Sequence, residues 1–141
     1  WGMPIAFFSL VLGWLLALWL GEEFSMHALP IAQWILLGVL INGFAHIPFA
    51  LLQSAGRADL TAKLHVIELP IYIFLIVVLV AAFGIVGAAV AWTVRIALDT
   101  AMLFGLARAY FPALRNQLML ALFMAGLLSL MILAVNALII G

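Results

Sequence analysis

Residues 53–72, QSAGRADLTAKLHVIELPIY, form a long polar interruption in an otherwise apolar chain. They hold four of the ten charged side chains, Arg57, Asp59, Lys63 and Glu68, together with the titratable ring of His65. Apolar runs long enough to cross a bilayer lie on both sides of this stretch. The pattern predicts a turn between two membrane helices, which leads directly into a helix that carries polar groups into the membrane.

The composition of the whole chain predicts an integral membrane protein. Hydrophobic residues make up 70% of the 141 residues and charged residues 7%, whereas a soluble domain carries about 25% charged residues. The net charge is zero, so no basic face points to nucleic acid, and the absence of cysteine excludes disulfides and thiolate metal sites. The chain opens on Trp1 without a preceding basic region, and we expect it to be a piece of a longer protein.

Five segments are long and apolar enough to span a bilayer as helices, and the connections between them are too short to hold another domain. Continuous apolar runs differ from the alternating pattern of barrel strands. We therefore predict an all-α, polytopic transmembrane bundle, a single membrane domain over residues 1–141. The predicted helices cover about residues 3–20, 28–53, 60–82, 85–110 and 118–140.

Basic residues predict the orientation of the bundle. Arg57 and Lys63 flank one turn, and Arg108 and Arg115 flank the turn two helices later. The turn at residues 21–23, Gly-Glu-Glu, has no basic residue. Because short cytoplasmic loops are enriched in Lys and Arg, we expect the loops near 54–59 and 111–117, with the turn residues Gly56, Arg57 and Lys63, to face the cytoplasm.

Two charged residues, Arg95 and Asp99, lie near the middle of the predicted helix 85–110. Each costs about 2.5–3.5 kcal/mol at the centre of a bilayer, so both must face protein or water. Their spacing of four lets them pair with each other. A row of small residues predicts close packing of the opposite face against a neighbouring helix: Ala89, Thr93, Ala97, Ala101, Gly105 and Ala109. A structural ion pair and a substrate or ion path remain alternative interpretations of the two charges.

Residues on the neighbouring helices reach the same depth. Thr61, His65, Glu68 and Tyr72 share one face of the predicted helix 60–82, where Pro70 permits a kink. Counting residues from the turns puts Glu68 level with Asp99 and Tyr72 level with Arg95. On the helix 28–53, His46 comes level with Glu68 and Asn42 with Tyr72. We predict one polar layer at mid-depth, with these candidates for a substrate or ion pathway: Arg95, Asp99, Glu68, His46, Asn42 and Tyr72.

Motifs of catalysis and cofactor binding are absent from the sequence. It contains no phosphate-binding loop, no GxSxG and no dinucleotide-binding glycine pattern, and His65-x-x-Glu68 departs from HExxH. Only two Asp residues occur, far apart, so no acidic cluster is available to hold magnesium. The sequence therefore predicts no catalytic residues, no enzyme activity, no cofactor and no metal site.

Several short motifs together carry a resemblance to a known family. They are Leu-x-x-x-Gly-Arg at residues 52–57, the acidic residue and proline at 68 and 70, the run GIVGAAVA at 84–91, and WLGEEF at 19–24. In this order and spacing they resemble the C-terminal half of bacterial polysaccharide and O-antigen flippases. These flippases belong to the multidrug/oligosaccharidyl-lipid/polysaccharide exporter superfamily. The resemblance covers most of the chain.

The resemblance implies part of a two-lobed transporter that flips undecaprenyl-pyrophosphate-linked oligosaccharide across the inner membrane by alternating access. A proton or sodium gradient would be its driving force, and Arg95 would contribute to a cationic cavity. The expected partners are the bilayer, the lipid-linked oligosaccharide, a coupling cation and the N-terminal lobe, which this chain lacks, so the chain alone should not transport. A multidrug exporter of the same superfamily and a membrane-embedded glycan-processing enzyme are the alternatives, and a non-catalytic membrane scaffold is a further one. Neighbouring genes for glycosyltransferases and a polymerase would favour the flippase.

Overall fold

The computed structural model describes residues 22–140 and, before them, residues 11, 15 and 18. The described chain is helical, as predicted, and contains α2 (Glu22–Ser54), α3 (Ala58–Tyr110), the 3-10 turn η1 (Pro112–Leu114) and α4 (Arg115–Ile140). Three of these helices are long and apolar enough to cross a membrane. The helix predicted over 3–20 lies almost wholly outside the described residues, and those predicted over 60–82 and 85–110 are the two arms of α3.

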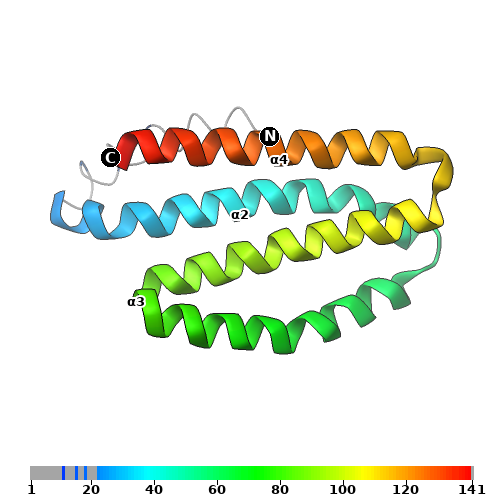
Figure 1. The fold of residues 1–141 in the computed structure, drawn as a ribbon, viewed down its shortest axis with the longest axis horizontal. Helices are drawn as coiled ribbons and strands as arrows, with labels where there is room; N and C mark the ends of the chain where they lie inside the picture. Colours follow the sequence, from blue (N-terminus) through cyan, green and yellow to red (C-terminus); the bar gives the residue numbers. More distant parts are fainter. Residues whose placement is uncertain (1–10, 12–14, 16–17, 19–21, 141) are drawn as a thin grey trace.

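The bend in α3 is made at Gly84, where φ is 61° and ψ is −139°. This left-handed conformation costs glycine little because it has no Cβ. The two arms fold back against each other from this point (Figure 1). Three residues later, Gly87 lies so close to the backbone carbonyl of Leu79 that a Cβ atom would overlap it. The glycines of the predicted turn thus have separate roles, one in reversing the chain and one in letting the arms approach.

Both other connections lie at the opposite end of the bundle from Gly84 (Figure 1). Gly56 has a φ of 71° in the turn between α2 and α3. Beside it, Arg57 binds Asp59 at 3.1 Å, and its guanidinium lies 4.5 Å from the centre of the Tyr110 ring. The hydrogen bond with Asp59 raises the pKa of Arg57 above its ordinary value. Lys63 binds Asp59 at 3.5 Å on the helix surface. The contact with Tyr110 ties the two turns together.

Helix α2 lies between α4 and the second arm of α3, with the first arm on the outer side of the hairpin (Figure 1). Near the turns, Leu52 packs with Ala45, Leu64 and Leu103. Towards the other end, α2 and α4 meet through three buried side chains, Leu37, Leu40 and Ile132. Gly38 of α2 lies directly against the ring of Trp92 of α3, so α2 and the second arm of α3 approach closely at this level.

The outer surface of the bundle is apolar. On the first arm of α3 the exposed large side chains include Val66, Ile67, Leu69, Phe74 and Val77. A water-facing surface would carry charges at many of these positions, whereas acyl chains solvate them well. Helices α2 and α3 continue through their internal prolines, Pro30, Pro48 and Pro70.

The prediction of one continuous small-residue contact along the second arm of α3 was wrong. Ala89 and Thr93 are buried, and the Thr93 hydroxyl donates a 2.7 Å hydrogen bond to the Trp34 carbonyl of α2. Ala101 and Gly105 are exposed. A spacing of four advances about 40° round a helix of 3.6 residues per turn, so such a row winds away from any one neighbour.

Candidate functional site

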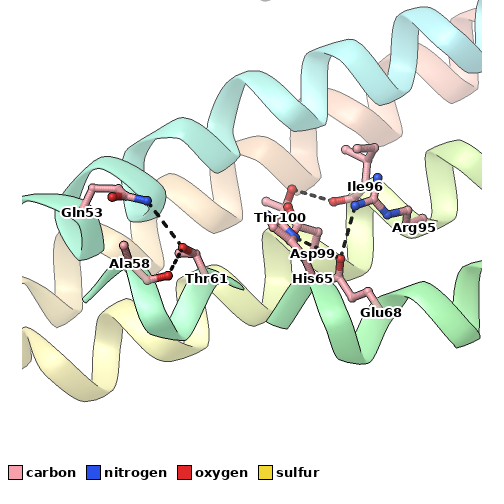
Figure 2. Close-up of polar contacts among 9 residues, drawn as sticks. All are labelled: Gln53, Ala58, Thr61, His65, Glu68, Arg95, Ile96, Asp99 and Thr100. Carbon is pink, nitrogen blue, oxygen red and sulfur yellow. Dashed lines mark hydrogen bonds and ion pairs between the residues drawn. The ribbon is translucent and has the colours of Figure 1, made fainter. Parts of the chain in front are cut away.

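Four ionisable side chains meet between the two arms of α3. His65 and Glu68 come from the first arm, and Arg95 and Asp99 from the second (Figure 2). Glu68 lies ten residues after the start of α3, which is about 15 Å along the helix and about half of a hydrocarbon core. Antiparallel pairing of the arms brings Arg95 and Asp99 to the same region, as counting from the turns predicts.

Glu68 is at the centre of the group. The residue is 3% exposed. Its Oε2 lies 3.7 Å from a terminal guanidinium nitrogen of Arg95 and 3.5 Å from Nδ1 of His65. The spacing of four allows Arg95 to pair with Asp99 on its own helix, and the structure pairs it with Glu68 instead. Glu68 reaches Arg95 from the facing arm, whereas Asp99 contacts His65.

His65 joins the two carboxylates, although it is absent from the predicted pathway residues. Its Nδ1 lies 3.4 Å from Oδ1 of Asp99 as well as 3.5 Å from Glu68. The sequence does contain a signal for this role, because His65 shares a helix face with Thr61, Glu68 and Tyr72. Its position three residues before Glu68 places it nearer the turn, about 4.5 Å from the predicted layer along the helix axis.

A cavity of about 210 Å³ opens beside this group, between α2 and the two arms of α3. Asn42 and His46 reach it from α2, and His65, Arg95 and Asp99 reach it from α3. Its other lining residues are apolar: Ala45, Phe49, Ile96 and Leu103. Four of the six predicted pathway residues therefore line one cavity.

The remaining two predicted residues lie behind Arg95. The guanidinium sits 5.6 Å from the centre of the Tyr72 ring, within the range of a cation–π contact. Glu68 and Tyr72 line a small gap with Arg95 on this side. Arg95 thus has one side towards the cavity and the other towards an aromatic ring and a buried carboxylate. The turn residues Gly56, Arg57 and Lys63 are not among the residues that line the cavity.

The charges of the site are only partly compensated. Both oxygens of Glu68 and Oδ1 of Asp99 are buried, and they have no hydrogen-bond partner among the described residues. Buried carboxylates without hydrogen bonds are costly, and here they have only ion-pair contacts of 3.4–3.7 Å, to Arg95 and His65. Such a site can attract a cation to its carboxylates, or present Arg95 to an anion in the cavity.

Comparison with known proteins identifies a relative. A protein of Shigella flexneri with the name "Putative O-antigen transporter" is 33% identical over 102 residues, which are 72% of this chain and 24% of that protein. This chain spans about a quarter of the length of the relative. No family model and no solved structure matches the chain. The relative and the three long apolar helices support a multi-pass membrane protein. Together with the motifs at 52–57, 68–70 and 84–91, this similarity supports the assignment of the chain to the O-antigen flippase family.

Proposed function

We propose that this chain is part of the C-terminal lobe of a carrier that flips undecaprenyl-pyrophosphate-linked oligosaccharide across the bacterial inner membrane for O-antigen synthesis. Residues 1–141 form one membrane domain in this proposal, and the N-terminal lobe completes the carrier. The observation that carries it is the cavity at mid-depth, which places the Arg95 guanidinium beside Asn42 and His46 inside an apolar bundle. The name of the Shigella flexneri relative supports the substrate class over a drug.

Arg95 would hold the pyrophosphate of the lipid carrier. A guanidinium forms two parallel hydrogen bonds with phosphate oxygens, and these are stronger than neutral ones. Asn42 and His46 line the same cavity and would supply further donors. Glu68 and Tyr72 would orient the guanidinium when the cavity is empty, and release it when the anion arrives. The guanidinium alternates between these two arrangements as the two lobes of the carrier rock. A coupling cation drives the rocking.

Complementation tests the proposal. A strain that lacks its own O-antigen transporter receives the protein or a variant, and surface O-antigen is measured next to a blot of membrane protein. We expect Arg95→Gln and Glu68→Gln to lose more O-antigen than any fall in their membrane level explains. Arg115→Gln and Asp59→Asn are the matched controls, because they remove the same kinds of charge from exposed positions. Normal O-antigen in both site variants would refute the role of the cavity.

Sidedness is tested separately. The chain has no cysteine, so single introduced cysteines report without background from it. We propose that the turns near 54–59 and 111–117 face the cytoplasm, and that Phe83, at the opposite end, faces the other side. Ser54→Cys should be labelled by an impermeant thiol reagent only after the membrane is opened, and Phe83→Cys should be labelled from outside. Labelling of Ser54→Cys from outside, and of Phe83→Cys only after the membrane is opened, would show that the topology is the inverse.

A further inference from the structure

Three side chains of the types that ligate transition metals converge between the arms of α3. His65, Glu68 and Asp99 each offer one ligand atom, and these atoms all lie within 4.8 Å of one another. They come from two segments more than thirty residues apart in the sequence. No sequence motif joins them, and the group exists only because the hairpin at Gly84 folds the second arm onto the first.

The separations match a metal site better than hydrogen bonds. Nδ1 of His65 lies 3.5 Å from Oε2 of Glu68 and 3.4 Å from Oδ1 of Asp99. A good N–H···O hydrogen bond measures about 2.9 Å. Ligand atoms of a tetrahedral zinc ion lie about 3.4 Å apart, because Zn–N and Zn–O bonds are about 2.0–2.2 Å long. The two separations from His65 therefore fit the ligand spacing around a small divalent cation, and all three atoms lie within 4.8 Å of one another.

Buried carboxylate oxygens without hydrogen bonds point to a ligand. Both oxygens of Glu68 and Oδ1 of Asp99 lack hydrogen-bond partners within the part of the chain that the structure describes, and the two residues are 3% and 6% exposed. Two such carboxylates close together disfavour each other's charge unless a cation lies between them. The third ligand, His65, is 44% exposed and lines the cavity, so it offers a path of entry.

We propose that His65, Glu68 and Asp99 bind a divalent transition-metal cation of the zinc type. The imidazole nitrogen decides the class of ion, because sodium, calcium and magnesium prefer oxygen ligands, whereas zinc accepts nitrogen and oxygen together. Two carboxylates and one neutral imidazole balance the charge of such an ion. Water or Asn42 and His46 in the adjoining cavity would complete its coordination.

Arg95 makes this site responsive to the cavity. Its guanidinium lies 3.7 Å from Oε2 of Glu68, so it competes with the metal for the carboxylate and repels the ion. An anion that draws Arg95 into the cavity removes this competition, and by linkage the metal then favours anion binding in return. This coupling rests on the proposed function, whereas the metal site itself does not.

The experiment measures binding to the purified protein in detergent after removal of metals. Zinc is titrated calorimetrically, and Co²⁺ is added as a probe whose visible absorption reports nitrogen and oxygen ligation. We expect one saturable site, weakened by about tenfold or more in Asp99→Asn and in His65→Ala. Asp59→Asn, the same substitution on an exposed carboxylate, is the control and should bind as the parent does. His65 is partly exposed, so its variant tests the site even where a buried substitution prevents folding.

A second variant should change the affinity for zinc in the opposite direction. Arg95→Gln should tighten zinc binding roughly tenfold, because the competing cation is gone. Absence of saturable binding, or equal binding by Asp99→Asn and Asp59→Asn, would overturn the metal site. An infrared band of a protonated carboxyl that persists in excess zinc and disappears in Glu68→Gln would also overturn it, by assigning the group to a shared proton. Since binding is measured without transport, these results leave the complementation test of the proposed function independent.

Discussion

Replacement of Arg95 by Gln should destabilise the bundle, because it leaves the buried carboxylate of Glu68 without its guanidinium. At the 3.7 Å separation of Arg95 and Glu68, two unit charges interact by about 4 kcal/mol at an effective dielectric constant of about 20. Removal of one partner from a buried pair typically costs about 3–5 kcal/mol. The Arg95 side chain is 29% exposed, so water screens part of the interaction, and we expect about 3 kcal/mol.

The double variant Arg95→Gln/Glu68→Gln separates pairing from packing. Both side chains remain polar and similar in size, but no unpaired charge is left at this position. We expect it to be more stable than the sum of the single variants by about 1–3 kcal/mol. Reversible unfolding in mixed detergent micelles gives the four free energies of unfolding, with a chelator present so that no divalent cation contributes.

Additive effects within about 0.5 kcal/mol would refute the pairing of Arg95 with Glu68. Arg115→Gln is the matched control, since it removes an exposed guanidinium outside the site and should leave the free energy of unfolding unchanged. Pairing of Arg95 with Asp99 along one helix would instead give the greater coupling energy in the cycle of Arg95→Gln with Asp99→Asn.

Further predictions concern the helix contacts. Gly87→Ala should destabilise the hairpin by about 1–3 kcal/mol, because its Cβ overlaps the Leu79 carbonyl, whereas Gly105→Ala meets no atom within 4 Å and should stabilise by about 0.5–1 kcal/mol. Equal effects of the two, measured by unfolding in micelles, would contradict the close approach of the arms. Thr93→Val keeps the shape but removes the 2.7 Å hydrogen bond to Trp34, and should cost about 0.6 kcal/mol. A loss of several kcal/mol would assign Thr93 a further role.

The sequence by itself determined that the chain is a set of membrane helices and where the chain reverses. Hydropathy and glycine act locally: apolar runs must hydrogen-bond their own backbone in lipid, and Gly56 and Gly84 adopt conformations that other residues avoid. Depth was also predictable. Each residue advances a helix by about 1.5 Å, so counting from the turns brings Glu68, Arg95 and Asp99 to one level even with an error of a residue or two.

Only the tertiary structure decided which of these side chains meet. One residue of uncertainty changes depth little, but it rotates a side chain by about 100° around the helix axis. Sequence reasoning therefore allows Arg95 to pair with Asp99, leaves His65 out of the predicted pathway, and keeps the small residues on one face. Packing of Gly87 on Leu79 and of Gly38 on Trp92 sets the rotation of the helices. With that rotation, Arg95 pairs with Glu68 and His65 lies between two carboxylates. Side chains at the same depth meet only when they also point towards each other.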